Sequence, residues 1–251
     1  MARYQAVLEY DGTDFLGFQR QAEGRTVQGD VEAALSRLGW AGGSLLAAGR
    51  TDTGVHASGQ VVAFDLEWKH TPAELLRALN ANLAPDVAVK SLAPCPQDFH
   101  PRYRARGRHY RYTIYNAPVR SPLSARHAWH VASPTLNLSA MMAATPGLLG
   151  RHDFATFGTD PDAENQRGSN TVRTIRRADW SAPASAGWLH FDVVADAFLY
   201  RMVRSLVGAL KQVGAGDLSV SEFEELLDAR NRALCPPLAP PQGLCLVEVL
   251  Y

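Results

Sequence analysis

Long apolar runs are missing from this sequence, and their absence excludes a common class of protein. No stretch of the 251 residues approaches the roughly 18 consecutive apolar residues that a membrane-spanning helix requires. The first residues, MARYQAVLEYDG, lack the long apolar core of a secretory signal peptide. We therefore expect a cytoplasmic protein with no membrane partner.

Cysteine is scarce as well. The three cysteines are Cys95, Cys235 and Cys245. They stand far apart with no CxxC pair, so neither a disulfide framework nor a zinc site is indicated. His56, His100 and His109 belong to no H-x-x-x-H or His/Cys grouping, and we interpret them as polar or ligand-facing residues. The sequence predicts no bound metal.

Lysine is rare, and one long segment has no acidic residue. Lys and Arg total 25, as do Asp and Glu, so the net charge is zero, yet residues 99–152 contain eight arginines and no Asp or Glu. Arginine suits planar, bidentate contacts to phosphate, although genomic base composition produces the same bias. The segment favours an anionic partner, with that compositional bias as the alternative.

Strand and helix patterns follow each other in a similar order in both halves of the chain. Expected strands lie near residues 4–10, 59–66, 87–92, 108–115, 172–180, 188–195 and 244–250. Expected helices begin near Thr26, Thr71, Leu138, Phe198 and Ser219. The helix from Leu138 is expected to reach residue 149, and the helix from Phe198 to end before Gly214. Few βαβ crossovers are present, which favours the α+β class, and no GxGxxG or GxxxxGK[ST] motif indicates nucleotide chemistry.

The sharpest local feature is the loop at residues 48–56. Gly49 and Gly54 bracket a polar cluster that contains Arg50 and Asp52. Glycine permits tight turns and the close approach of another chain, so the loop can display both charged side chains to a ligand. The alternative is an ordinary turn with a local ion pair between arginine and aspartate.

A second feature is the basic segment at residues 100–112, in which arginines and tyrosines are interleaved. If residues 102–112 form one uninterrupted strand, then Arg102, Arg104, Arg106, Arg108, Tyr110 and Tyr112 project to one face. Arginines that hold phosphates beside tyrosines that stack on bases are typical of proteins that bind loops or single strands of RNA. The alternative is a solvated basic edge strand.

A third feature is an arginine at the margin of an apolar helix face. Arg204 lies beside the stripe formed by Met202, Leu206 and Leu210. An arginine in this position needs a partner, and solvent or a structural carboxylate is the ordinary one.

Taken together, these segments resemble the tRNA pseudouridine synthase A family over almost the whole chain. The most specific motif is GRTDTGVH at residues 49–56, which looks like that family's GRTDAGVH loop. The other motifs, in the family's order, are YDG at 10–12, GFQRQ at 17–21, NANL at 80–83, DFH at 98–100, YRY at 110–112, HDF at 152–154 and MVR at 202–204. The resemblance implies two similar α+β subdomains, residues 1–99 and 100–251, joined through a mainly antiparallel central sheet with flanking helices and a basic cleft between the halves.

The resemblance also implies an activity and the residues that carry it. The expected enzyme is an isomerase that converts uridine to pseudouridine at positions 38–40 of the tRNA anticodon arm, as a homodimer and without a cofactor. Asp52 is implied as the catalytic carboxylate and Tyr110 as the stacking aromatic for a flipped base. Arg204 is implied as the partner that keeps Asp52 ionised, and Arg50 as a group that holds the backbone or the flipped nucleotide.

Two other classes of function compete with this interpretation. A non-catalytic RNA-binding protein uses the same arginines and tyrosines but has no use for Asp52. A metal-dependent RNA hydrolase needs a chelatable ion, so undiminished product formation in EDTA would exclude it.

Overall fold

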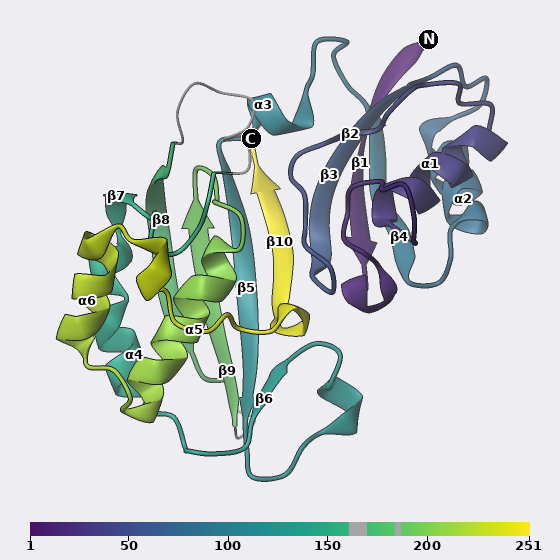
Figure 1. The fold of residues 1–251 in the computed structure, drawn as a ribbon. Coiled ribbons are helices and arrows are strands. Elements are labelled where there is room, and N and C mark those ends of the chain that lie inside the picture. The colour runs from purple at the N-terminus through teal and green to yellow at the C-terminus, as the bar shows by residue number, and fades with distance from the viewer. Residues whose placement is uncertain (161–169, 184–186) are drawn as a thin grey trace. The chain divides into compact units, whose positions relative to one another are not determined.

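The structure, a computed structural model, describes residues 1–160, 170–183 and 187–251. Within these residues the chain has ten strands and six α-helices (Figure 1). It forms two compact units, Met1–Arg106 together with Cys245–Tyr251, and Gly107–Leu244. Most strand pairs are antiparallel and helices flank the strands, so the predicted α+β class is confirmed. The division at residues 99 and 100 stays a prediction.

The first unit is built on a sheet in the order β4–β1–β3–β10, with β2 paired to β3. Its strands are β1 (Ala2–Tyr10), β2 (Leu46–Ala47), β3 (His56–Leu66), β4 (Val87–Pro94) and β10 (Leu244–Leu250). Its helices are α1 (Val27–Arg37), α2 (Pro72–Asn82) and the short α3 (Pro101–Arg104). β1 is antiparallel to β3 and β4, whereas β10 is parallel to β3.

Local sequence explains why the long helices of this unit begin where they do. The Thr26 side chain accepts a hydrogen bond from the Gly29 N–H at the start of α1. At α2, Thr71 and Glu74 form a capping box, with proline in the first turn. Both predicted starts are confirmed.

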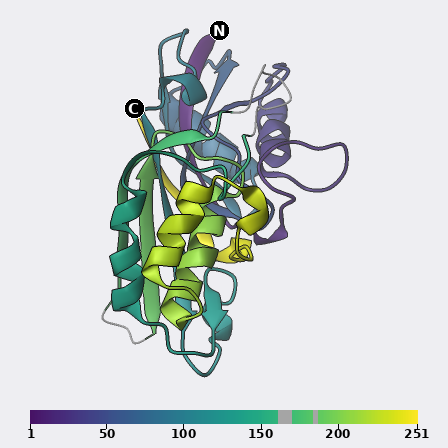
Figure 2. The same ribbon diagram turned by 60° about the vertical axis from the view of Figure 1, so that its left-hand side comes forward.

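The second unit has a sheet in the order β6–β5–β9–β8–β7. Its strands are β5 (Gly107–Asn116), β6 (Trp129–Val131), β7 (Gly150–Asp153), β8 (Val172–Ser181) and β9 (Trp188–Ala195). Its helices are α4 (Leu138–Ala144), α5 (Met202–Ala215) and α6 (Val220–Ala229), which contact one another (Figures 1 and 2). Tyr112, Phe191 and Trp180 lie opposite one another on adjacent strands and are buried, so this face of the sheet carries the core of the unit.

Residues 102–112 do not form one uninterrupted strand, whereas the strand predicted near residues 108–115 is confirmed as β5. The His100 side chain accepts a hydrogen bond from the Arg102 N–H and caps α3, and Pro101 occupies the first position of that helix. β5 begins only after this helix. Arg102 and Arg104 are therefore helical and do not share a strand face with the tyrosines.

The helix predicted from Phe198 to Gly214 is also corrected at both ends. Arg201 has a φ of 61°, a left-handed conformation that excludes it from the helix, so α5 begins at Met202. Gly214 lies inside the helix, where a Cβ atom would come 2.5 Å from the Met141 sulfur, and Gly216, with a φ of 81°, provides the actual cap. Gly214 is a packing residue, and its role as a helix end was predicted wrongly.

α4 is shorter than the predicted helix from 138 to 149. It ends at Ala144, and Pro146 begins a separate 3-10 turn (Pro146–Leu148). Proline at this position cannot donate the hydrogen bond that would continue the α-helix. The proline was present in the predicted span and is the signal that marks its end.

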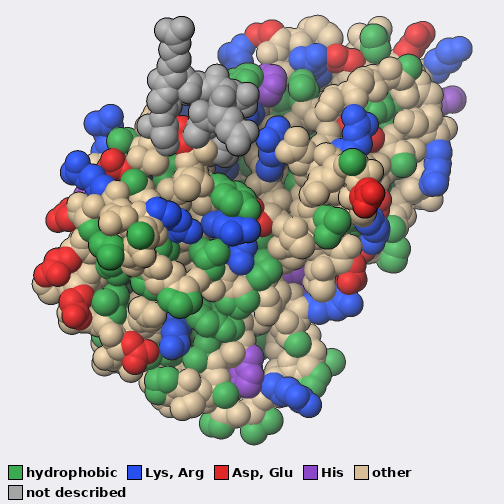
Figure 3. All heavy atoms as spheres, viewed as in Figure 1, with side chains coloured by type: hydrophobic (Ala, Val, Ile, Leu, Met, Phe, Trp, Pro, Cys, Tyr) green, Lys and Arg blue, Asp and Glu red, His purple; other side chains and the backbone are tan. Residues whose placement is uncertain are grey.

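α6 carries an acidic face. Its capping box joins Ser219 and Glu222, and Glu224, Glu225 and Asp228 are exposed. The acidic side chains gather at the left of Figure 3, where α6 lies in Figure 1. In the part of the chain that the structure describes, no helix has the length and apolar character needed to span a membrane.

Candidate active-site loop

The GRTDTGVH segment forms a loop between β2 and β3 in the first unit. Ala48, at the start of the loop, is buried, and its N–H donates a hydrogen bond to the Val61 carbonyl oxygen at 2.9 Å. Arg50 is exposed and Asp52 is half-buried. The loop therefore leaves β2 in a fixed direction and carries both charged side chains beyond the end of the strand.

Two buried side chains hold the backbone on the N-terminal side of Asp52. The Gln60 amide nitrogen donates a hydrogen bond to the Gly49 carbonyl oxygen at 2.9 Å, and Gln60 is completely buried. The Tyr10 hydroxyl and the Thr51 hydroxyl are 2.8 Å apart in a buried hydrogen bond. Buried polar groups that are fully hydrogen-bonded rigidify their surroundings, so the position of Asp52 is well defined.

A tight turn holds the backbone on the C-terminal side of Asp52. The Val55 N–H donates to the Asp52 carbonyl oxygen at 3.1 Å. Gly54 has a φ of 77°, which glycine adopts without steric cost. At Gly12 an added Cβ atom would lie 2.0 Å from the Val55 carbonyl oxygen, so only glycine lets the segment after β1 approach the turn.

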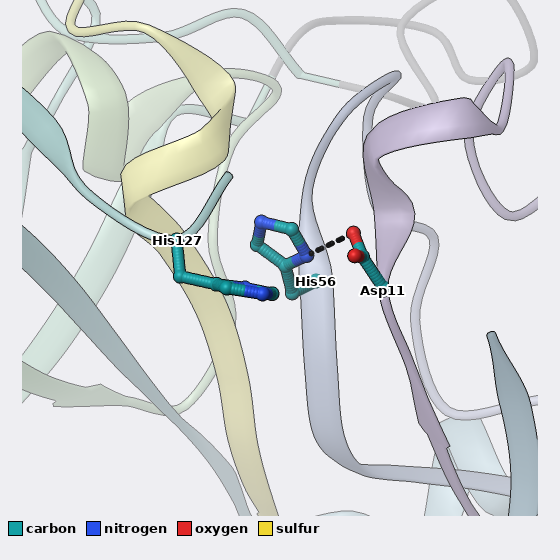
Figure 4. A group of neighbouring side chains, drawn as sticks. All are labelled: Asp11, His56 and His127. Carbon is teal, nitrogen blue, oxygen red and sulfur yellow. Dashed lines mark ion pairs between the residues drawn. The ribbon is translucent and has the colours of Figure 1, made fainter. Parts of the chain in front are cut away.

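The loop ends at His56, whose ring nitrogen Nδ1 has two neighbours. The Gly12 N–H lies 3.0 Å from this nitrogen. An Asp11 carboxylate oxygen lies 3.2 Å from it, and the dashed line in Figure 4 marks this ion pair. A hydrogen bond from Gly12 requires a lone pair on Nδ1, whereas an ion pair with Asp11 requires a proton there. The same Asp11 oxygen already accepts hydrogen bonds from the Thr13 N–H and hydroxyl. Both contacts join His56 to the segment after β1 and anchor the turn.

The second unit carries the other two residues predicted for the site. Tyr110 lies on β5, opposite Val193, and is half-buried. Its ring meets the Phe198 ring edge to face, with centroids 5.0 Å apart. Arg204 lies in the first turn of α5, and its Nε donates to the Ala239 carbonyl oxygen at 2.8 Å. Both side chains are thus positioned by contacts within their own unit.

An ionic cluster on β5 and β9 uses part of the basic segment. Asp192 is 3% exposed and accepts hydrogen bonds from Arg111 at 3.0 Å and from His109 at 2.6 Å. Burial acts to raise the pKa of Asp192, but hydrogen bonds from Arg111 and His109, together with their charges, outweigh burial and lower that pKa. Arg111 and His109 are therefore structural partners of a buried carboxylate.

The structure places Arg50 and Asp52 on one loop, and Tyr110 and Arg204 in the other unit. The union of these four residues in one site stays a prediction. Gln60 and the pairing of Tyr10 with Thr51, which support the loop, were not predicted from the sequence. Tyr10 and Gln60 both lie in strands, and the one available signal was the polar Gln60 directly before the apolar run at residues 61–64.

Comparison with known proteins identifies the class to which this fold and loop belong. The family model described as tRNA pseudouridine synthase matches residues 6–104 and 144–251, so the chain belongs to the tRNA pseudouridine synthase family, a family of isomerases. It is similar to proteins named tRNA pseudouridine synthase A. The protein from Geobacter sulfurreducens is 42% identical, with 100% of each chain covered. The protein from Streptococcus equi subsp. equi is 40% identical over 100% of this chain and 99% of the relative.

A solved structure also aligns with this chain. It is described as an unknown protein from Galdieria sulphuraria, and the alignment covers 84% of this chain and 91% of that chain at 14% identity. Its TM-score is 0.22, which is too low to support an inference.

Proposed function

We propose that this protein converts uridine to pseudouridine at positions 38–40 in the anticodon arm of tRNA. The observation that carries the proposal is the full-length similarity to proteins named tRNA pseudouridine synthase A, which extends through the GRTDTGVH loop. The expected partner is tRNA, bound by a homodimer in the cytoplasm. Neither a metal nor a cofactor enters the proposed reaction.

Asp52 is the proposed catalytic residue. The reaction breaks the bond from C1′ to N1, rotates the uracil and joins C5 to C1′. C5 loses its proton and N1 gains one, so the atoms balance without oxidation or hydrolysis. An ionised carboxylate can promote it by attack at C1′, by attack at C6, or by removing the proton on C2′. The buried hydrogen bonds of Gln60 and Tyr10 support this role because they fix the loop backbone before the substrate arrives.

The other three residues have proposed binding roles. Tyr110 stacks on the flipped base, which offsets part of the few kcal/mol that base flipping costs. Its packing against Phe198 supports this role because the ring is already oriented. Arg204 stabilises the ionised form of Asp52, and the exposed Arg50 holds the nucleotide or the backbone beside it.

The test is nucleotide-resolved mapping of pseudouridine in unmodified tRNA treated with the pure protein. We expect new pseudouridine at one or more of positions 38–40 and none elsewhere, formed equally well in EDTA. Asp52→Asn is the matched control, and it should bind tRNA with nearly unchanged affinity and form no product. Pseudouridine at other positions would overturn the target, and RNA cleavage that stops on chelation would overturn the reaction.

A further inference from the structure

The segment Gly17–Phe18 lies directly against the loop that carries Asp52. A Cβ atom at Gly17, whose φ is 91°, would come 2.9 Å from the Thr51 carbonyl oxygen and 3.3 Å from the Asp52 carbonyl carbon. The Phe18 N–H donates to the same Thr51 oxygen at 3.0 Å. Arg20 follows two residues later, within about 7 Å of backbone length. The backbone contacts of Gly17 and Phe18 therefore hold the Arg20 backbone near the loop.

The Arg20 guanidinium is held by a buried carboxylate on α1. Its Nη1 donates to Glu32 at 2.8 Å, and Glu32 is 5% exposed. The other Glu32 oxygen accepts hydrogen bonds from the Gln28 amide at 2.8 Å and from the Leu45 N–H at 2.9 Å. Each Glu32 oxygen therefore accepts a hydrogen bond. The carboxylate is held by α1 and by the backbone of Leu45, which directly precedes β2.

The Arg20 backbone is anchored to the same group. Its N–H donates to the Gln28 side-chain oxygen at 3.0 Å. The Gln28 side chain thus accepts a hydrogen bond from the Arg20 N–H and donates one to Glu32. Gln28 and Glu32 together hold the backbone and the guanidinium of Arg20. This arrangement restricts the rotamers of Arg20. Ordering a free arginine side chain costs about 2 kcal/mol of conformational entropy, and the restriction lowers that cost.

The Arg20 guanidinium stays open to solvent although its partner is buried. The Arg20 side chain is 56% exposed, while the Glu32 side chain is 6% exposed. Among the described residues, Nη1 is the one guanidinium nitrogen that donates a hydrogen bond. Nε and Nη2 therefore keep their N–H groups available as a pair of donors, which can match two oxygens of a phosphate group.

We propose that Arg20, positioned by Glu32 and Gln28, binds a backbone phosphodiester of the substrate RNA next to the target uridine. The inference rests on the proposed function, because it takes RNA as the ligand of the Asp52 loop. Arg20 is a binding residue, and Glu32 is its positioning residue.

The test compares tRNA affinity across a salt series for four variants. Arg20→Gln should raise Kd about tenfold and lower the slope of log K against log salt by about 0.9, the value for one phosphate contact. Arg20→Lys keeps the charge but not the paired donors, so its slope should equal that of the wild type while Kd rises about threefold. Glu32→Gln should likewise leave the slope unchanged and raise Kd about twofold to threefold, because it loosens the guanidinium without removing its charge.

Arg37→Gln is the matched control. Arg37 is the last residue of α1, roughly 15 Å along the helix from its first residue, Val27. Its side chain is exposed and contacts the Asn82 carbonyl oxygen. Its removal should leave Kd and the slope at wild-type values. If Arg20→Gln has the same Kd and salt slope as Arg37→Gln, the proposal is overturned, even if the wild type forms pseudouridine normally. If Arg20→Gln is poorly folded by thermal melting, Arg20→Lys decides, and wild-type affinity in that variant also overturns the proposal.

Failure of the proposed function gives a different result. A wild-type protein that binds tRNA through Arg20 but forms no pseudouridine would overturn the activity and leave the phosphate contact standing. Normal pseudouridine formation by the wild type, together with unchanged tRNA affinity in Arg20→Gln, would overturn the phosphate contact and leave the proposed activity standing.

Discussion

The Asp52 loop and the basic strand β5 use polar residues in opposite ways. The loop has few charges, yet two buried side chains support it. Gln60 donates to the Gly49 carbonyl oxygen, and the Tyr10 hydroxyl bonds to the Thr51 hydroxyl. β5 begins in the most basic part of the sequence, yet Arg111 is bonded to the buried Asp192 within the same unit. The density of charge in a sequence therefore says less about a ligand site than the number of buried groups that the fold places around it.

The partners of the other arginines extend this comparison. Arg104 pairs with Asp98 on the surface, and Arg108 donates to the Asp196 carbonyl oxygen. The tract that lacks acidic residues is thus supplied with acceptors from elsewhere in the chain. The four predictions below test whether the loop and the strand differ in this way.

Asp52→Asn should produce the largest effect and separate activity from stability. We expect the rate to fall at least about 1,000-fold, or about 4 kcal/mol of barrier, because the amide can act neither as nucleophile nor as base. The carboxylate is half-buried at a turn, so the melting temperature should change by only about 2 °C. Tritium release from tRNA that contains 5-tritiated uridine measures the rate. Release at the wild-type rate would remove Asp52 from the mechanism.

Asp192→Asn should instead reduce stability. Loss of this buried charge leaves Arg111 and His109 without their shared acceptor, and we expect about 3 kcal/mol less free energy of unfolding at pH 7. Because the pKa of Asp192 is lowered in the folded protein, its contribution is present above the unfolded value of about 3.9 and is lost as pH falls through the folded value. Urea titrations of both proteins should therefore converge below about pH 4. A difference that stays constant from pH 7 to pH 3 would contradict the ionic role.

Gln60→Met should weaken the loop without removing a charge. The change keeps the volume but deletes the donor to the Gly49 oxygen, at a cost of about 1–2 kcal/mol in stability. A loosened loop should lower kcat about tenfold and leave KM within twofold, because Gln60 positions Asp52 and does not bind the RNA. Single-turnover kinetics check this split, and Gln60→Glu, which keeps the shape, serves as the comparison. A rise in KM at constant kcat would contradict the positioning role.

Arg104→Gln should have the smallest effect. Its ion pair with Asp98 is more than half exposed on both sides, and such pairs contribute about 0–1 kcal/mol. We expect a change of less than about 0.5 kcal/mol, measured by urea unfolding at 50 mM and 500 mM salt. A larger loss at both salt concentrations would show that the surface pair is structural, like the pair at Asp192.

Much of the fold could be predicted because its signals are local. The capping residues Thr26, Thr71 and Ser219 define helix starts within four residues of sequence, and each is confirmed. The end of α5 could not be predicted in this way. Gly214 and Gly216 are both plausible caps, and the choice depends on the packing of Gly214 against Met141, which is distant in the sequence.

The site was predicted less completely, for the same reason. The loop motif identifies Asp52, but its supports come from Tyr10, 41 residues before Thr51, and from Gln60, 11 residues after Gly49. No periodicity relates such positions. The strand predicted near residues 108–115 is confirmed as β5, but it does not extend back to residue 102, because Pro101 begins a short helix there.

The pairing of β10 with β3 has a consequence for how the chain is made. Cys245 and Leu246 lie opposite His56 and Ala57, and Gly59 leaves room for the Val247 carbonyl oxygen. The ribosome must therefore translate the whole of the second unit before the first can gain its fifth strand. Until then the nascent protein keeps an uncovered edge at the start of β3, a surface on which unfinished chains aggregate.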